Sequence, residues 1–273
     1  MPLNWPTFFT RLGSAIIFCI IMMTGLLWND TGFVALVSVI QLLCFREYFS
    51  LVRKIQPDTY WPDWMENTVQ VICFVWVWLL SSFFKGLTPA PFFFLLFFPI
   101  LILLLAVLDK RTALAAALQA LAGLFYIFLP MVMLVIMYRR EGYILPLALI
   151  LMLWTNDTMA YLVGSFIGKT PFSPISPKKT WEGTAGGALL TIAGAAAFGY
   201  YTGEYRMVDW IMLALCASVA GTAGDLLESK LKRLAGVKDS GTMMPGHGGA
   251  LDRFDSLLVA TPFAFVYAYL FMF

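Results

Sequence analysis

The sequence predicts an all-α, polytopic integral membrane protein, and three observations support this prediction. Hydrophobic residues make up 60% of the chain, whereas soluble domains contain roughly 45–50% apolar residues. The mean hydropathy is +0.81. Apolar runs of about 20 residues, the length that crosses a bilayer, recur from one end of the chain to the other.

We expect about nine transmembrane helices. A polar segment at 46–67 joins the second span to the third and is interpreted as an interfacial stretch. No repeat or separate soluble domain is evident, so we divide the chain into N-terminal transmembrane helices (1–110) and a C-terminal transmembrane region (111–273). The nine spans are expected near residues 12–28, 32–45, 68–84, 91–108, 113–137, 143–166, 183–201, 209–228 and 257–273.

The lysines and arginines indicate the orientation. With nine alternating spans, fourteen of the 18 lie on the side of the N-terminus and four on the other side. Cytoplasmic loops carry the excess of positive charge. We therefore predict a cytoplasmic N-terminus and cytosolic loops at 167–182 and 229–256. The fourteen are Arg11, Arg46, Arg53, Lys54, Lys110, Arg111, Lys169, Lys178, Lys179, Lys230, Lys232, Arg233, Lys238 and Arg253.

The composition also argues against some classes of protein. A net charge of +2 without a basic face argues against a nucleic-acid partner. The four cysteines lie singly in separate apolar segments, so we expect buried thiols and neither disulfides nor a zinc site. They are Cys19, Cys44, Cys73 and Cys216.

A dense polar segment at 229–255 lies between two apolar spans. It contains five Lys or Arg residues, three Asp residues, five of the 21 glycines and the only histidine, in a chain with 12% charged residues. Such a concentration of charge at a membrane edge indicates a charged ligand. We interpret the ligand as a nucleoside triphosphate with a divalent metal ion.

Two aspartates are expected at the same depth in the membrane. Asp157 lies fourteen residues after Tyr143 at the outer start of the sixth span, or roughly 21 Å along a helix. Asp225 lies fifteen residues after Trp210 in the eighth span, or about 22 Å. In a hydrocarbon core of about 30 Å, both stop several ångström below the cytosolic edge. We therefore expect them to share a polar cavity open to the cytosol.

The eighth span ends in a polar face. Asp225, Glu228, Ser229 and Lys232 fall at i, i+3, i+4 and i+7, so they line one face of a helix. An acid at membrane depth is a functional candidate, and we assign Asp225 to a site. For Glu228 and Lys232, the alternative is a solvated helix end with a weak surface pair.

Asp252 and Asp255 flank Arg253 just before the ninth span. Acids are favoured at a helix start in any case, and Arg253 can also be a structural partner of either acid. With Asp225, however, they form the set of oxygen ligands that Mg²⁺ prefers, completed by water and substrate phosphate. Crowded carboxylates repel one another without a cation. We therefore predict a magnesium site at Asp225, Asp252 and Asp255.

The glycines of the run Pro245-Gly246-His247-Gly248-Gly249 let backbone amides approach phosphate oxygens. Alone, such a loop is more often a plain turn. Lys238 and Asp239 before it and Asp252 after it favour phosphate binding. His247 is a phosphate hydrogen-bond donor, a general acid or a part of the loop structure.

The cytosolic loop at 167–182 is a second polar cluster. The run Ser176-Pro177-Lys178-Lys179 tightens it where we expect phosphate, although its lysines can also serve only as topology determinants. Thr180 is expected to cap the seventh span, with Glu182 in the first turn. Three cations lie on the rim of this loop: Lys169, Lys178 and Lys179.

The segment from Ser229 to Asp255 resembles the signature of the phosphatidate cytidylyltransferases, or CDP-diacylglycerol synthases. The resemblance is carried by the Lys-Arg pair at 232–233, by Lys238-Asp239 and by the run from His247 to Asp255. The departures are mild: Met244 stands where the family usually has Leu, Ile or Phe, and Ala250 stands where it usually has a larger aliphatic residue. The run Ser176-Pro177-Lys178-Lys179-Thr180-Trp181-Glu182-Gly183 is similar to the family as well.

The resemblance implies an integral membrane enzyme that converts CTP and phosphatidate to CDP-diacylglycerol and pyrophosphate. It implies Mg²⁺ with a monovalent cation such as K⁺ beside it, and a homodimer. It also implies the inner (cytoplasmic) membrane, with the active site on the cytoplasmic side. Residues 111–273 would form the catalytic region.

Asp225 and Asp252 match metal-binding acids of that family, with Asp255 close by, and Lys232 matches a phosphate-contacting position. We predict these four as catalytic residues. The residues predicted to bind substrate are Asp157, Lys169, Ser176, Lys178, Lys179, Thr180, Ser229, Arg233, Lys238, Asp239, His247, Gly248, Gly249 and Arg253.

Two other functions stay open from the residues alone. In a cation-coupled membrane transporter, an intramembrane acid such as Asp157 would relay protons or bind a cation. That function gives no role to the glycine loop and the cytosolic lysines. A CTP-dependent polyprenol kinase-like enzyme would use the same polar groups, but it would leave CDP and no cytidylyl lipid.

Overall fold

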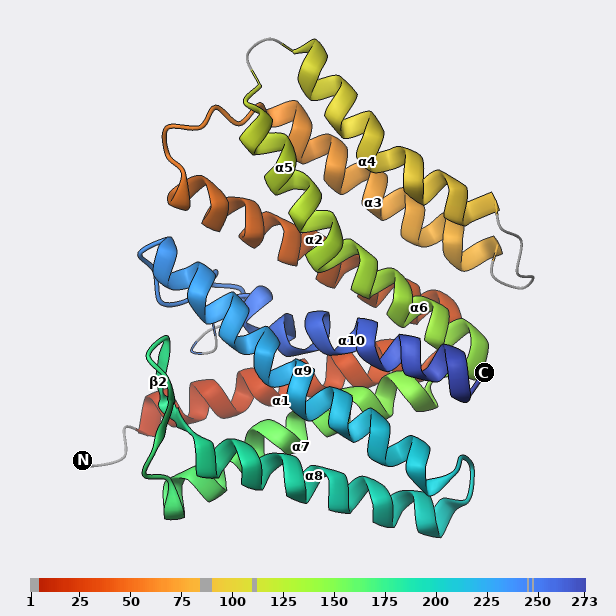
Figure 1. The fold of residues 1–273 in the computed structure, drawn as a ribbon, viewed down its shortest axis with the longest axis vertical. Helices are drawn as coiled ribbons and strands as arrows, with labels where there is room; N and C mark the ends of the chain where they lie inside the picture. Colours follow the sequence, from red (N-terminus) through yellow and green to blue (C-terminus); the bar gives the residue numbers. More distant parts are fainter. Residues whose placement is uncertain (1–4, 84–89, 110–111, 245, 247) are drawn as a thin grey trace. The chain divides into compact units, whose positions relative to one another are not determined.

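The computed structural model describes residues 5–83, 90–109, 112–244, 246 and 248–273. These residues form α-helices, one π-helical turn and a single antiparallel hairpin (Figure 1). The elements are α1 (Trp5–Leu27), α2 (Asp30–Ile55), α3 (Asp63–Phe83), α4 (Ala90–Leu108), α5 (Leu114–Gly123), η1 (Leu124–Phe128), α6 (Leu129–Glu141), α7 (Ile144–Ile167), β1 (Pro171–Ser173), β2 (Ser176–Thr180), α8 (Trp181–Thr202), α9 (Met207–Leu234) and α10 (Leu251–Phe271).

The chain divides into two compact units. Unit 1 comprises residues 1–139 and 234–253, which are α1 to α5, most of α6 and the loop before α10. Unit 2 comprises residues 140–233 and 254–273, which are α7, the hairpin, α8 and most of α9 and α10. The predicted C-terminal region therefore contributes to both units.

Helix α2 is the centre of unit 1, where it contacts α1, α3 and α5. Asn29 caps its N-terminus, since the Asn29 side chain accepts a hydrogen bond from the Gly32 amide at 2.7 Å. The Phe33 ring stacks on Tyr138 with 4.1 Å between ring centroids. The buried face continues through Phe49 to Val52. This apolar face explains why α2 extends to Ile55, beyond the predicted end of the second span at residue 45.

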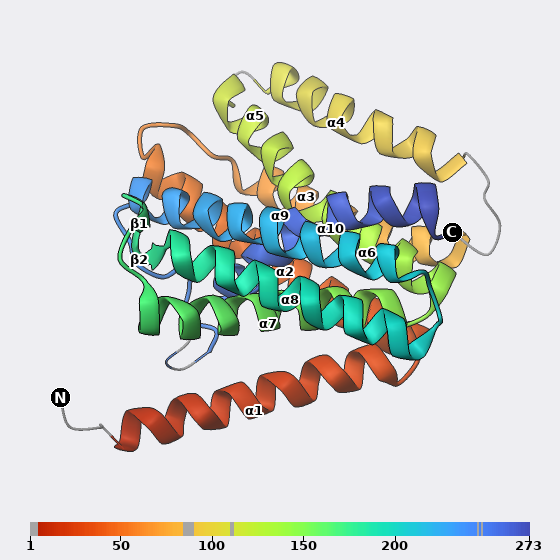
Figure 2. The same cartoon turned by 60° about the horizontal axis from the view of Figure 1, so that its bottom comes forward.

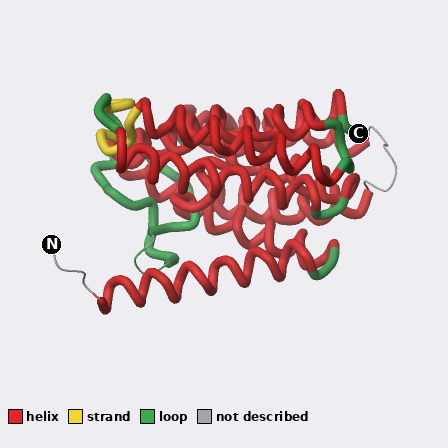
Figure 3. The backbone as a smooth tube through the Cα atoms, turned by 90° about the horizontal axis from the view of Figure 1, so that it is seen from below, coloured by secondary structure: helices red, strands yellow, loops and turns green. Residues whose placement is uncertain are grey.

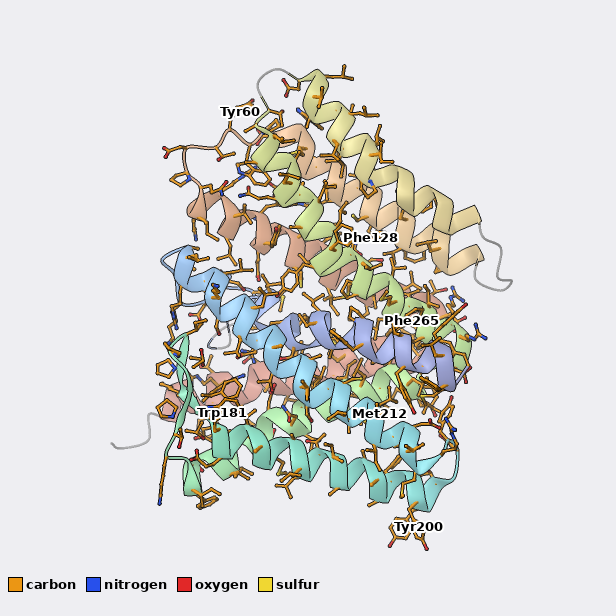
Figure 4. The ribbon with its side chains drawn as sticks, viewed as in Figure 1. Tyr60, Phe128, Trp181, Tyr200, Met212 and Phe265 are labelled. Atoms are coloured by element: carbon orange, nitrogen blue, oxygen red, sulfur yellow. The ribbon has the colours of Figure 1, made fainter. Side chains whose placement is uncertain are left out.

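Helices α5 and α6 form one continuous helical segment, which contains the π-helical turn Leu124–Phe128. Pro130, two residues after this turn, has no amide hydrogen for the bond back to the preceding turn, which favours such a local change of winding. The Tyr48 hydroxyl of α2 donates to the Gln119 carbonyl just before this turn, at 2.9 Å. Phe128, at the end of the turn, is buried (Figure 4).

In unit 2, α7 and α8 run side by side in opposite directions (Figures 1 and 2). Small residues form their interface. A Cβ atom at Gly187 would lie 2.8 Å from the Asn156 carbonyl oxygen, and one at Gly183 would lie 2.7 Å from the Ala160 carbonyl oxygen. Small residues let membrane helices approach closely and pack by van der Waals contact.

A short hairpin lies between α7 and α8, in the segment predicted as a cytosolic loop of an all-α protein (Figure 3). Its register pairs Pro171 with Thr180 and Ser173 with Ser176. Trp181, at the start of α8, packs on Phe172 with 4.4 Å between ring centroids (Figure 4). The hairpin thus fixes the segment that carries Lys178 and Lys179.

Among the described residues, six helical segments are long and apolar enough to cross a membrane. The chain is therefore a multi-pass, mainly α-helical membrane protein. The segments are Phe9–Leu27, Asp30–Ile55, Leu114–Glu141, Ile144–Ile167, Met207–Leu234 and Leu251–Phe271.

The cysteines are free thiols, as predicted. Cys44 and Cys73 are buried and Cys216 is half-buried. The prediction of burial is wrong for Cys19, which is exposed on α1. This side chain lies on an apolar face, because Ile16, Ile17 and Ile20 are exposed beside it on the same helix.

The close approach of α7 and α8 can be tested with two alanine substitutions in α8. Gly187→Ala should lower the melting temperature in detergent by several degrees, since the new methyl group meets backbone atoms that cannot move aside. The matched control is Gly194→Ala, where no described atom lies within 4 Å of the added Cβ. Equal melting temperatures for the two variants would contradict the packing.

Candidate functional site

A cavity of about 460 Å³ lies in unit 2. It is lined from four elements, since α7, the hairpin, α8 and α9 each contribute side chains. The lining residues are Asn156, Asp157, Ala160, Tyr161, Gly164, Ser165, Ser176, Lys178, Lys179, Thr180, Thr184, Thr222 and Asp225. Six residues predicted from the sequence therefore line one space: Asp157, Ser176, Lys178, Lys179, Thr180 and Asp225.

Asp157 of α7 and Asp225 of α9 both line this cavity, so the prediction that they share one is confirmed. The Lys179 ammonium nitrogen lies 2.5 Å from Asp225 Oδ2, and both side chains are 29% exposed. This ion pair joins the hairpin to α9. It also neutralises a carboxylate that would otherwise be costly on a membrane-spanning helix.

Asn156 adds an uncompensated polar group to the cavity. It is 2% exposed, and its Oδ1 atom has no hydrogen-bond partner among the described residues. A buried amide without a partner costs free energy unless a ligand or water completes it. Asn156 therefore presents a polar group to whatever occupies the cavity.

Asp255 of α10 lies close to these groups. It is 6% exposed, and its Oδ1 accepts a hydrogen bond from the Ser256 amide at 2.6 Å. Its carboxylate interacts electrostatically with Asp225, Asp157 and Lys232. Three acids in one part of unit 2 repel one another, which is the arrangement that a bound cation relieves.

The Glu228 carboxylate is fully buried and lies 2.5 Å from the Lys232 ammonium nitrogen. The alternative of a weak pair at a solvated helix end is therefore wrong for these two residues. Helix α9 continues past the predicted span end at 228 to Leu234, so Ser229 and Lys232 lie on the helix, as their spacing predicted, and Arg233 lies there as well. Ser229, Lys232, Arg233 and Lys169 are not among the described residues that line the cavity.

The start of α8 holds the hairpin in place. The Thr180 hydroxyl accepts a hydrogen bond from the Gly183 amide at 3.1 Å, so the predicted N-cap is confirmed. The Glu182 carboxylate accepts hydrogen bonds from the amides of Lys169 and Thr170 and from the Thr170 hydroxyl. Together with its own amide, these donors lower the pKa of Glu182 to about 2.

In unit 1, Asp252 holds the glycine loop. Its Oδ2 accepts hydrogen bonds from the Gly249 amide at 2.7 Å and the Ser240 amide at 2.9 Å. The predicted metal ligand Asp252 therefore also closes the loop on the start of α10. The Asp252 amide in turn donates a hydrogen bond to the Ser240 hydroxyl at 3.3 Å. This reciprocal pair of bonds between Ser240 and Asp252 resembles a capping box.

A second cavity, of about 600 Å³, lies within unit 1 beside this loop. Three cations line it, and one of them is Arg11 of α1, whose only predicted role was in membrane topology. His247 lies outside the described residues. The lining residues are Arg11, Lys238, Asp239, Gly241, Thr242, Met244, Gly246, Gly248 and Arg253.

Glu47 of α2, which was not predicted as a site residue, accepts hydrogen bonds from the Ala250 and Leu251 amides at 2.9 and 2.8 Å. The only sequence signal is an acid inside a helix whose apolar pattern continues past residue 45. The partners of Glu47 lie about 200 residues further along the chain, so no local pattern points to them.

Among the described residues, no group of three or more His, Cys, Asp or Glu side chains forms a ready-made metal cage. Magnesium does not need such a cage, because it binds through one or two carboxylates with water and substrate phosphates. Asp225 and Asp255 in unit 2 fit that requirement, since they are oxygen donors crowded enough to interact.

The comparison with known proteins gives one consistent result. A model described as the cytidylyltransferase family matches residues 9–271. The phosphatidate cytidylyltransferase of Synechocystis sp. is 31% identical over 293 residues, which cover 95% of this chain and 94% of that protein.

Two further relatives are similar over a shorter region. The phosphatidate cytidylyltransferase of Staphylococcus aureus (strain COL) is 46% identical over 127 residues, 45% of this chain and 48% of that protein. That of Haemophilus influenzae is 39% identical over 138 residues, 48% of each chain. The chain thus spans about half the length of these two relatives.

The role of Glu182 predicts a pH dependence. Its pKa lies at about 2 instead of 4.5, so its hydrogen bonds stabilise the loop above about pH 4.5 and are lost as the pH falls towards 2. Amide hydrogen exchange at Lys169 and Thr170 should be faster in Glu182→Gln than in the wild type at pH 6. The two proteins should converge at low pH.

The control is Glu204→Gln, which changes an exposed acid between α8 and α9. It should match the wild type at both pH values. Equal exchange of Glu182→Gln and wild type at pH 6 would contradict the role of Glu182.

Proposed function

The chain belongs to the cytidylyltransferase family, and from this we propose that it transfers CMP from CTP to phosphatidate. The products are CDP-diacylglycerol and pyrophosphate. The observation that carries the proposal is the cavity of unit 2, where Lys178 and Lys179 of the hairpin face Asp157 and Asp225. The named activity of the relatives supports the same reaction.

The reaction is an in-line displacement at phosphorus. A phosphate oxygen of phosphatidate attacks the α-phosphorus of CTP and forms the new P–O bond. The bond from the α-phosphorus to the oxygen that bridges to the β-phosphorus breaks, and its electron pair leaves with pyrophosphate. The phosphate monoester is already largely ionised at neutral pH, so no general base is required. Such a transfer depends mainly on positioning and on the neutralisation of charge.

The cavity supplies these two requirements. Lys178 and Lys179 provide positive charge for the phosphates of CTP and for the leaving pyrophosphate. Ser176 and Thr180 offer hydroxyl groups beside them, and the Asn156 amide offers a further polar contact. A phosphatidate headgroup lies at the membrane interface, and a cavity formed by membrane helices and a loop can meet it there.

We propose Mg²⁺ at Asp225 and Asp255 of unit 2, with a monovalent cation such as K⁺ beside it, and from the sequence motif we propose Asp252 of unit 1 as a magnesium ligand. Asp225 and Asp255 are supported by their mutual proximity in unit 2, and Asp252 by its place in the sequence motif. The ion would offset the repulsion between two anionic substrates. With Asp225 neutralised in this way, Lys179 would no longer have to pair with it and would become available to phosphate.

The remaining proposals concern the membrane and the assembly. We propose nine spans, a cytoplasmic N-terminus and a location in the inner membrane with the active site facing the cytoplasm. The excess of lysine and arginine on one side supports this orientation. We propose a homodimer as well, on the resemblance to the family alone.

Purified protein should release pyrophosphate only when CTP, phosphatidate and Mg²⁺ are all present, and a cytidylyl lipid should form in equal amount. A lipid kinase would instead leave CDP and a phosphorylated lipid. A transporter would release no pyrophosphate. Either of these two results would overturn the proposed function.

One variant and its control test whether the reaction takes place in the cavity of unit 2. In Asp225→Asn, kcat should fall by roughly 100-fold or more, because a ligand of the magnesium ion is lost. The matched control is Asp63→Asn, in which the changed side chain is 93% exposed at the start of α3. It should keep the wild-type rate. A wild-type rate in Asp225→Asn would remove this residue from the site.

A further inference from the structure

Glu47 binds the start of α10 from a distant part of the sequence. Its Oε1 accepts a hydrogen bond from the Ala250 amide at 2.9 Å, and its Oε2 accepts one from the Leu251 amide at 2.8 Å. The Ser240 hydroxyl donates to Oε2 at 2.8 Å. All of these residues belong to unit 1.

A carboxylate suits this position for two reasons. The first amides of a helix have no partner within the helix, and two of them point at Glu47. The helix dipole also makes this end of α10 partly positive, which favours a negative charge. A glutamine would offer one oxygen in place of two, and its amide hydrogens would face a backbone donor.

Asp252 also contacts Ser240 and the residue before Ala250. Its Oδ2 lies 2.9 Å from the Ser240 hydroxyl and 2.7 Å from the Gly249 amide nitrogen. Ser240 therefore lies between the two carboxylates and is buried. Glu47 and Asp252 together fix the path of the loop where it enters α10.

The packing around Glu47 explains two glycines of the motif. A Cβ atom at Gly241 would lie 2.3 Å from Glu47 Oε1, and one at Gly249 would lie 2.3 Å from Oε2. No side chain fits at either position while the carboxylate stays in place. Gly241 and Gly249 therefore pack directly against Glu47, although α2 and the loop are far apart in the sequence.

We propose that Glu47 is a positioning residue for cytidylyl transfer. It fixes Ser240 and the start of α10 at Ala250 and Leu251, and thereby the orientation of the Asp252 carboxylate and of the Gly249 amide that donates to it. It contacts neither substrate nor metal itself. This inference rests on the proposed function, in which Asp252 is a magnesium ligand.

The test compares Glu47→Gln with the wild type in detergent micelles. Residues that orient a metal ligand typically change metal affinity or activity by about 10–100-fold. In Glu47→Gln we expect the Mg²⁺ concentration for half-maximal rate to rise by roughly tenfold, and kcat to fall by a similar factor. Hydrogen exchange at Ala250 and Leu251 should be faster, with or without Mg²⁺, because both amides lose the charged acceptor.

Two further variants separate positioning from general stability. Asp30→Asn removes a different acid of α2, which pairs with Arg139 within unit 1. It should leave the Mg²⁺ dependence and the exchange at Ala250 and Leu251 unchanged. Gly249→Ala disturbs the same contact as Glu47→Gln, so the double variant should lose little more activity than the worse single variant.

The outcomes are distinct. Unchanged exchange at Ala250 and Leu251 would overturn the contact itself. Faster exchange with wild-type kcat and Mg²⁺ dependence would show a purely structural contact and overturn the positioning role. A wild-type protein that forms no cytidylyl lipid would overturn the proposed function and with it the positioning role, while faster exchange would still establish the contact.

Discussion

The ion pair between Lys179 and Asp225 links the two kinds of element that make the cavity of unit 2. Asp225 lies on a membrane-spanning helix, where an isolated carboxylate is costly. Lys179 lies on a hairpin that reaches it only because Thr180 and Glu182 fix where α8 begins. The need to neutralise the Asp225 carboxylate therefore favours a position of the hairpin that brings Lys179 to it. We propose that the same side chains exchange this ion pair for contacts with substrate and metal during the reaction.

Acidic side chains in this protein repeatedly bind backbone amides. Glu182 binds the amides before β1, Asp252 binds those of the glycine loop, and Glu47 binds those at the start of α10. Backbone amides outside regular helices and strands have no partner within the element and need other acceptors. A carboxylate supplies two strong acceptors and also complements a helix start. The polar loops are therefore ordered by acids, of which Glu182 and Glu47 have no part in the proposed reaction, whereas Asp252 is also a proposed magnesium ligand.

The sequence predicted those features that depend on local patterns. Thr180 was identified as a cap because its neighbours define a helix start. Asp157 and Asp225 were predicted to share a cavity from the constant rise of a helix, and both line one. The hairpin was missed, since it is short and its side chains do not alternate in polarity. Glu47 was missed because its partners are about 200 residues away. The burial of the ion pair between Glu228 and Lys232 was not predicted, because spacing along a helix does not show burial.

The most direct test of the central claim is lysine footprinting, in which an amine-reactive reagent and mass spectrometry report the accessibility of each lysine. Saturating CTP with Mg²⁺ should protect Lys178 and Lys179 from modification by several-fold, because phosphates occupy the cavity that they line. Lys54, at the end of α2 in unit 1, should react at the same rate with and without CTP. Unchanged modification of Lys178 and Lys179 at saturating CTP would contradict the assignment of this cavity to the phosphates.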